Sequence, residues 1–300
     1  MRVVASALPG RSHTTSERRF AAALLAPAML ALALTTTFPL LYLAWTSVHR
    51  IDLAMPFMDG FVGAANYADL LADPRFWSSL AISLIYTVST VALQVAIGLA
   101  LALFVMEMTR GQGMFRAIAI LPVVLSPAVV GMVWRTFMLA PEFGVVDYLS
   151  ITAGLGSQNW LGDPTLALIS VIVIHTWQWT PFAFMVLLAS LAALPDDIYE
   201  AARLDRANAW ARFRRITLPL LRPAIVMVVI MRTMVALTAF AAIFTVTGGG
   251  PGTATEILNL YAYRKSFTEL SLGYGSALAM ALLLLTIAIS GVLFWLRRAR

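Results

Sequence analysis

The 300-residue sequence predicts an all-α membrane protein with six transmembrane helices and with both termini in the cytoplasm. Hydrophobic residues make up 60% of the chain, charged residues make up only 12%, and the mean hydropathy is +0.84. So few charged side chains cannot cover a core of that size, and lipid must therefore replace water around much of it. Six apolar stretches are each long enough for a helix to cross a hydrocarbon layer about 30 Å thick. Basic residues also concentrate in alternate connecting segments, which sets the orientation.

The six predicted spans are defined by their lack of charge. Residues 20–48, 76–106 and 270–296 contain no charged side chain, and the other three stretches contain only Arg135, His175 and Arg232. We place the spans at residues 20–48, 80–106, 117–140, 166–194, 223–247 and 272–296, within one transmembrane domain over 20–298 that follows a tail at 1–19. The first span follows basic residues, as a signal peptide does. Its 29 uncharged residues exceed a signal-peptide core, so we expect a retained helix.

The distribution of Lys and Arg predicts the orientation. The tail at 1–19, the loops at 107–116 and 195–222 and the C-terminal tail hold fifteen basic residues, whereas the alternate loops hold four. Because basic residues are retained on the cytoplasmic side, both termini and these two loops are expected there. The outer loops at 49–75 and 141–163 contain several aromatic residues, which suit interfacial helices at headgroup level.

The sequence offers no chemistry of its own for hydrolysing ATP. Its only lysine, Lys265, lacks the glycines of a phosphate-binding loop. The glycine-rich run 247–252 lies at the expected outer end of the fifth span with no cation beside it, and we interpret it as a turn that ends the helix. Cysteine is absent and the three histidines are dispersed, so we expect no catalytic residue, no metal site and no cofactor in this chain.

Two other classes of function stay open at this point. All fifteen acidic residues lie outside the spans, which disfavours an ion-coupled secondary transporter of a polar solute, because such carriers place Asp or Glu inside the membrane. Gln94, His175 and broken helices could still serve an ion, so that class remains the alternative. A membrane scaffold or sensor is the third.

The cytoplasmic segment 195–222 is predicted to form two short amphipathic helices. Pro195 suits the first turn of a helix, and the two acidic residues after it suit the positive end of the helix dipole. Apolar residues then recur on one face on both sides of a joint expected near residues 205–208. Composition alone would make this segment a basic helix on the membrane surface.

The order of residues in this segment is more specific than its composition. Glu200-Ala-Ala-x-x-Asp205, followed by Ile216-Thr-Leu-Pro219, resembles the EAA loop of permease subunits in bacterial ATP-binding-cassette (ABC) importers. Three other motifs resemble the carbohydrate branch, with its maltose, glycerol-phosphate and trehalose-type permeases: Trp160-Leu-Gly-Asp-Pro164, Trp177 with Pro181-Phe182, and Thr247-Gly-Gly-Gly-Pro251. The resemblance covers about residues 20–298 and implies the type I ABC importer permease fold.

This resemblance implies a non-enzymatic subunit of the bacterial cytoplasmic membrane that moves a sugar, a polyol or a glycerol-phosphate type of solute. The implied partners are a second homologous permease, a dimer of ATPase subunits holding ATP and Mg²⁺, an external solute-binding protein and membrane lipid, with no nucleic acid. In that family the EAA loop docks in a cleft of the ATPase. The residues implied in this coupling are Glu200, Ala201, Ala202, Asp205, Arg206, Trp210 and Phe213.

One position of the loop departs from the family. A glycine normally follows the aspartate and permits the turn between the two helices, whereas this chain has Arg206. Either the turn adopts an ordinary backbone conformation, or the ATPase cleft has changed.

A substrate pathway is expected between the fourth and fifth spans. Arg232 is costly in a membrane interior, and it either snorkels, bonds to carbonyl groups or meets a substrate. The fourth span has a polar and aromatic patch around Pro181, which we expect to open the helix locally. By position, the resemblance to the maltose permease implies a pathway lined by Gln178, Trp179, Phe182, Arg232, Ala236 and Ala239. The tryptophans could instead be packing residues.

Overall fold

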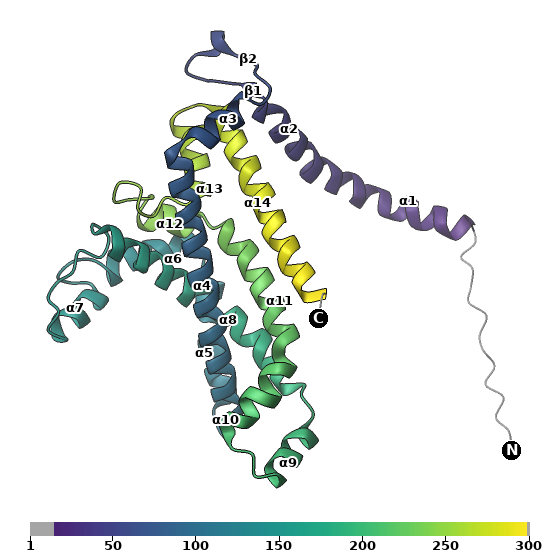
Figure 1. The fold of residues 1–300 in the computed structure, drawn as a ribbon, viewed down its shortest axis with the longest axis vertical. Helices are drawn as coiled ribbons and strands as arrows, with labels where there is room; N and C mark the ends of the chain where they lie inside the picture. Colours follow the sequence, from purple (N-terminus) through teal and green to yellow (C-terminus); the bar gives the residue numbers. More distant parts are fainter. Residues whose placement is uncertain (1–14, 299–300) are drawn as a thin grey trace.

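The protein is described here from a computed structural model, which covers residues 15–298 (Figure 1). The chain is mostly helical, at 77%, so the predicted all-α fold is confirmed. Five helices are long and apolar enough to cross a membrane: Ala22–Ser47, Pro74–Glu107, Pro164–Ala192, Ala209–Leu237 and Leu272–Leu296. A sixth span is complete only if the bent pair Gln112–Val124 and Pro127–Met138 counts as one.

The elements follow one another in a simple order. The N-terminal part contains α1 (Thr15–Leu32), the π-helix η1 (Ala33–Thr37), α2 (Phe38–Ser47), β1 (His49–Arg50), η2 (Pro56–Met58), β2 (Gly60–Phe61), α3 (Ala65–Ala72) and α4 (Pro74–Glu107). The middle contains α5 (Gln112–Val124), α6 (Pro127–Val133), η3 (Trp134–Met138), α7 (Val145–Thr152), α8 (Pro164–Ala192), α9 (Asp196–Leu204), α10 (Ala209–Arg212) and η4 (Phe213–Thr217). The remainder is α11 (Leu218–Leu237), α12 (Ala241–Val246), α13 (Leu258–Tyr263), η5 (Arg264–Thr268) and α14 (Leu272–Arg298).

The third span is broken, which the expectation of one helix over 117–140 missed. Helices α5 and α6 meet at an angle of 96°. Leu125 and Ser126 at the break have extended backbones, with ψ of 141° and 134°. Pro127 explains the break, because a proline disfavours helical backbone at the residue before it and has no N–H to continue the hydrogen-bond ladder.

The fifth span also differs from the expected 223–247. The helix already begins at Ala209, runs without interruption through Pro219 and Pro223, and ends at Leu237. A short break at 238–240 separates it from α12. The Asn259 Nδ2 amide donates to the carbonyls of Thr238 at 3.1 Å and Ala239 at 3.4 Å, so it satisfies acceptors that the broken helix leaves free.

The most extensive helix packing joins α4 to α8 at the centre of the molecule. At Gly98 of α4, a Cβ atom would lie only 2.9 Å from both the Ala183 Cβ and the Phe184 backbone nitrogen. The absence of a side chain at Gly98 therefore sets how near the two helices approach. Around this contact lie the buried side chains Ala102, Phe184 and Leu187.

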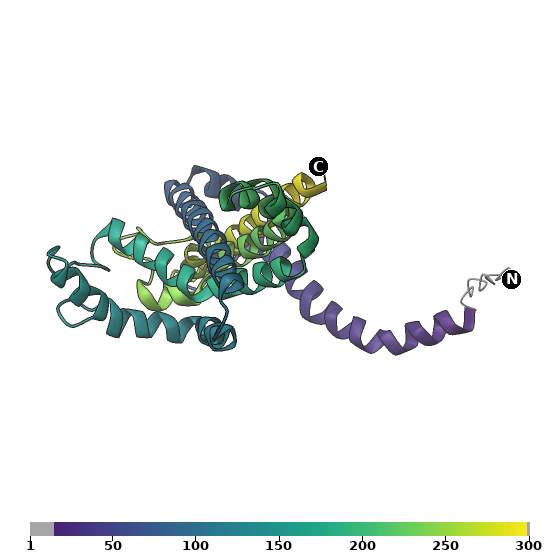
Figure 2. The same cartoon turned by 90° about the horizontal axis from the view of Figure 1, so that it is seen from below.

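The N-terminal helix leaves the rest of the molecule. Helix α2 packs against α14, but α1 projects away from the bundle (Figures 1 and 2). None of its most apolar 18-residue window is buried, and large side chains such as Phe20 and Leu24 are exposed. Lipid or another subunit must cover this surface.

The two outer loops hold helices, as expected, together with a small sheet that was not predicted. Helices α3 and α7 lie in the loops at 49–75 and 141–163, and β1 pairs with β2 in antiparallel fashion. Asp147 of α7 fastens its loop by accepting from the Ser157 hydroxyl, the Trp160 indole and the backbone of Glu142 and Gln158. These donors, the Gln158 amide foremost, lower the pKa of Asp147 to about 2.

Candidate functional site

The segment predicted to be cytoplasmic folds as two short helices joined by a tight turn, and we call residues 196–217 the coupling hairpin. Arg206 lies at the turn with a φ of 56°, in the left-handed region that favours glycine. The Ala207 amide donates to the Ala202 carbonyl at 3.0 Å, which closes a Schellman-type end to α9. The turn thus keeps a glycine-like geometry, which excludes the first of the two alternatives, an ordinary backbone conformation at Arg206.

The coupling hairpin presents only part of the predicted coupling set to solvent. Glu200, Ala201, Asp205 and Arg206 are exposed, whereas Ala202 is buried within this chain. Within the hairpin, the hydroxyls of Tyr199 and Thr217 lie 3.0 Å apart and tie α9 to the end of η4. Figure 1 shows it at one pole of the molecule, opposite the β1–β2 hairpin.

Trp210 and Phe213 lie in the second half of the coupling hairpin. Their ring centroids are 5.6 Å apart, Trp210 is 66% exposed, and Phe213 is half-buried. Both line a cavity of about 600 Å³ whose other walls come mainly from the C-terminal ends of α4 and α8. These two aromatic rings therefore face a cavity of this chain and are accessible to a partner.

Pro181 was expected to open the helix of the fourth span locally, but it does not. Helix α8 runs unbroken from Pro164 to Ala192 across it. Gln178 is fully buried, and its Nε2 amide donates to the Leu125 carbonyl at 3.0 Å. Gln178 thereby satisfies an acceptor freed by the break in the third span, whereas its Oε1 atom has no partner among the described residues.

The fourth and fifth spans meet at a buried cation. Arg232 is 2% exposed, its Nε donates to the Gln94 Oε1 at 2.8 Å, and its Nη2 lies 3.3 Å from the His175 Nε2. The guanidinium carbon lies 4.4 Å from the ring centroid of Trp179 and 5.8 Å from that of Phe182. We call these five residues the arginine cluster; the structure thus brings together three residues of the predicted pathway.

The two alanines of the predicted pathway lie beyond this cluster. Ala236 is buried in the hydrophobic core and Ala239 packs against it half-buried, at the start of the break after α11. Sequence reasoning did not connect Gln94 or Tyr86 of α4 with Arg232. The signal was a polar face on α4, where polar residues recur at helical spacing: Ser79, Ser83, Tyr86, Thr87, Thr90 and Gln94, all buried.

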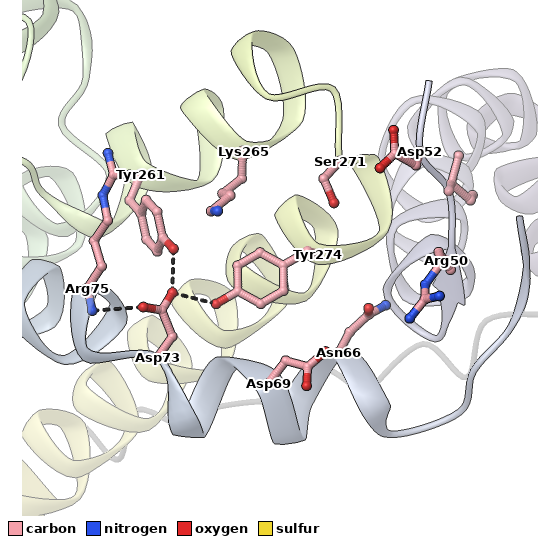
Figure 3. A pocket seen from close by; sticks show the side chains of 11 residues that line it. Arg50, Asp52, Asn66, Asp69, Asp73, Arg75, Tyr261, Lys265, Ser271 and Tyr274 are labelled. Carbon is pink, nitrogen blue, oxygen red and sulfur yellow. Dashed lines mark hydrogen bonds between the residues drawn. The ribbon is translucent and has the colours of Figure 1, made fainter. Parts of the chain in front are cut away.

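A polar pocket of about 430 Å³ lies at the N-terminal ends of α4 and α14 (Figure 3). Tyr261 and Tyr274 direct their hydroxyls at the Asp73 carboxylate, and both donate to its Oδ2 atom. Burial raises the pKa of Asp73, but the two tyrosine hydroxyls and the Arg75 amide outweigh it and leave that pKa below its ordinary value. The carboxylate therefore stays ionised and fixes both rings.

A buried ion-pair network lies beside this pocket. Glu256 is fully buried and accepts from Arg75 Nε and from Arg264 Nη1, each at 2.6 Å. Arg264 also donates to the Gly248 carbonyl, so a cation does lie beside the glycine-rich run, contrary to the sequence-based expectation. The network ties the loop after α12 to the start of α4 and to η5.

No group of three or more His, Cys, Asp or Glu side chains in residues 15–298 is arranged to hold a metal ion. The candidate sites are thus the coupling hairpin at one pole, the buried Arg232 within the fifth span and the polar pocket around Asp73.

Comparison with known proteins identifies relatives of this chain over most of its length. The family described as "Binding-protein-dependent transport system inner membrane component" matches residues 94–299. The trehalose/maltose transport system permease protein MalF of Thermococcus litoralis is 35% identical over 263 residues, or 87% of either chain. The sulfoquinovosyl glycerol transport system permease protein SmoG of Agrobacterium fabrum is 34% identical over 276 residues, which cover 92% of this chain and 89% of that protein.

A solved structure also shares the fold. It is the crystal structure of a bacterial alginate ABC transporter in complex with alginate pentasaccharide-bound periplasmic protein. One of its chains superposes with a TM-score of 0.79 at 21% identity and covers 93% of each chain.

Proposed function

Because the chain belongs to the family of binding-protein-dependent transport system inner membrane components, we propose that it is the permease subunit of an ABC importer that moves a saccharide or a similar polyhydroxylated solute. The relatives that it resembles over nine-tenths of its length are permeases for trehalose/maltose and for sulfoquinovosyl glycerol. The family consists of transport components, so the chain is not expected to catalyse a reaction.

A separate ATPase couples to this chain through the coupling hairpin. The single observation that carries this proposal is the Glu200-Ala-Ala-x-x-Asp205 motif, folded as an exposed hairpin that keeps a glycine-like turn at Arg206. Glu200, Ala201 and Asp205 form its exposed contact surface, and Trp210 with Phe213 offers an apolar anchor. ATP and Mg²⁺ belong to that partner.

The other proposed partners follow from uncovered surface and from charge. The unburied apolar face of α1 needs a second permease or lipid against it. The alginate transporter with the same fold is seen with a periplasmic protein, which supports an external solute-binding protein at the outer loops. Fifteen basic residues on the side of the hairpin and of both tails support cytoplasmic termini.

The substrate pathway is proposed to pass the arginine cluster. Trp179 and Phe182 are half-buried, so their rings are open to the apolar C–H faces of a sugar, and Arg232 can donate to its oxygens. Ala239, which is half-buried, is proposed to line the opposite wall, whereas Ala236 is packed in the core. Gln178 is assigned instead to the structural role of capping the break at Leu125.

Uptake of radiolabelled saccharides into cells that depend on this chain tests the proposal. Glu200→Ala and Ala201→Asp should each abolish ATP-driven uptake without reducing the amount of protein in the membrane. Lys265→Gln is a suitable control, because its ammonium pairs with Glu269 far from the hairpin. An ATPase and a second permease should copurify with the chain. Uptake that persists without an ATPase would instead support the ion-coupled secondary transporter.

Cysteine labelling tests the pathway, because the natural chain has no cysteine. Ala239→Cys should react with a water-soluble thiol reagent in at least one transport state, and added substrate should slow the reaction. Gly98→Cys, at the α4–α8 contact, should not react. An unreactive position 239 in every state would remove this wall from the pathway.

A further inference from the structure

Arg232 is a buried cation without a counter-charge. In the described part of the chain no carboxylate forms an ion pair with it, and its polar contacts are the neutral side chains of Gln94 and His175. A guanidinium can only donate, so the His175 Nε2 facing it must be the acceptor and the imidazole is neutral. An uncompensated charge in a membrane interior is costly, and such a residue usually has a functional partner.

The surroundings of Arg232 contain a surplus of hydrogen-bond donors. The contacts to Gln94 and His175 occupy two of its five N–H groups. Tyr86 packs its ring 5.2 Å from that of His175 and lies near enough to interact electrostatically with Arg232. The Tyr86 hydroxyl is buried and has no hydrogen-bond partner among the described residues. Unused N–H donors of Arg232 and the unpartnered O–H of Tyr86 are groups that an oxyanion would satisfy.

The open side of the cluster is aromatic. Trp179 and Phe182 are the half-buried members, whereas Arg232, Gln94, His175 and Tyr86 are each at least 97% buried. A ligand approaching from the Trp179 side would therefore meet ring faces first and the cation last. This order suits a molecule with a sugar ring and an attached negative group.

Building on the proposed function, we propose that the arginine cluster, together with Tyr86, receives the anionic group of an acidic saccharide, a carboxylate or a sulfonate, so that this permease handles charged rather than neutral sugars. Arg232 supplies the charge and the bidentate fork, and Tyr86 supplies an additional O–H donor. Gln94 and His175 position the guanidinium by holding Nε and Nη2. Nothing else in the described spans would neutralise this charge.

A matched pair of ligands tests the proposal. Sulfoquinovosyl glycerol and glucosylglycerol differ only in a sulfonate or a hydroxyl on carbon six of the sugar. Binding of each is measured by isothermal titration calorimetry to the purified transporter complex without its external binding protein. The wild type should bind the sulfonate at least about tenfold more tightly, which is the effect expected of a charge-assisted pair.

Three variants locate that preference. Arg232→Gln should abolish it, because a neutral amide cannot form a charge-assisted pair with the sulfonate. Tyr86→Phe removes only an unpartnered hydroxyl and should reduce the preference about threefold. Arg135→Gln is the control: Arg135 also lies in a span but is exposed and donates to the Thr245 carbonyl, so the preference should not change. If Arg232→Gln fails to assemble, Tyr86→Phe decides.

Three results would overturn the inference: equal binding of the two ligands by the wild type, a preference that survives both Arg232→Gln and Tyr86→Phe, or binding of methanesulfonate as tight as that of the sulfonated sugar. The last would indicate a site for free anions. The uptake assay judges the proposed function separately. Saccharide uptake without an Arg232-dependent preference overturns this inference alone, whereas uptake that needs no ATPase overturns both.

Discussion

The left-handed backbone at Arg206 predicts that Arg206→Gly stabilises the coupling hairpin. A residue with a Cβ atom pays about 1–2 kcal/mol to adopt this conformation, and glycine removes most of that cost. Glycine also increases the conformational entropy of the unfolded chain, which destabilises the folded hairpin by about 0.4–1 kcal/mol. The difference is a net stabilisation of about 0.5–1 kcal/mol, confined to the end of α9.

Hydrogen exchange at the Ala207 amide reads this effect directly, because that amide donates to the Ala202 carbonyl across the turn. The expected gain corresponds to an exchange rate about two- to fivefold lower. Arg206→Ala is the matched control: it removes the guanidinium but keeps the Cβ, so its exchange rate should stay near that of the wild type.

The same two variants separate a backbone role from contact with the ATPase. If the Arg206 side chain contacts an acidic residue of the ATPase, glycine and alanine should both weaken assembly, and more so at low salt. Exchange at Ala207 that is unchanged or faster in Arg206→Gly would refute the reasoning from strain. Equal slowing in Arg206→Ala would assign the effect to charge instead.

Three further changes test packing and electrostatics elsewhere. Gly98→Ala should lower stability by about 1–3 kcal/mol, because its Cβ would lie 2.9 Å from Ala183 and Phe184; Gly291→Ala, with open space around it, is the control in the same thermal-unfolding assay. Glu256→Gln should lower the free energy of unfolding by about 2–3 kcal/mol, which is less than for a fully buried ion pair because both arginines are about a third exposed. Glu269→Gln is its control and should change the melting temperature little. The pKa of Asp147 lies below its ordinary value, so the outer loop should be fully stabilised above about pH 4 and lose that stabilisation as the pH falls through about 2. The stability of the 141–163 loop is measured as its resistance to proteolysis at a series of pH values. In Asp147→Asn the loop should already be sensitive to proteolysis at neutral pH.

Local patterns in the sequence predicted the features that depend on neighbouring residues. Span positions follow from runs of apolar residues, and in the described part of the chain helices long and apolar enough to cross a membrane overlap five of the six predicted spans. The coupling hairpin follows from Pro195 and the spacing of apolar residues around 205–208, and the structure has helices on both sides of Arg206. The grouping of Arg232 with Trp179 and Phe182 came from the family resemblance, because no local rule pairs residues 50 positions apart.

The features that were missed depend on contacts between distant segments. The break at Leu125 needs an outside donor for the freed carbonyl, and Gln178 provides it from another helix. Likewise, the partner of Arg232 on α11 is Gln94, which comes from α4, 138 residues away in the sequence. Pro127 is visible in the sequence as a residue that can break a helix. The prediction for 117–140 was based on hydropathy, which stays high across the proline, and so it missed the bend.

The helix geometry links the coupling hairpin to the buried cation through one element. From Ala209 to Leu237 the chain is continuously helical, and Arg232 lies about 20 residues along it from Arg212. At 1.5 Å per residue this places the cation about 30 Å from Arg212 in the hairpin. No flexible connection lies between the hairpin and Arg232, because the helix is unbroken from Ala209 to Leu237 and its first break, at 238–240, comes after Arg232. An axial displacement of the hairpin would therefore move Arg232 relative to Gln94 and His175, which lie on α4 and α8. Since the Arg232–Gln94 hydrogen bond is only 2.8 Å long, a shift of about 1 Å would already weaken it. The strength with which this cluster holds an anion would then depend on the position of the hairpin.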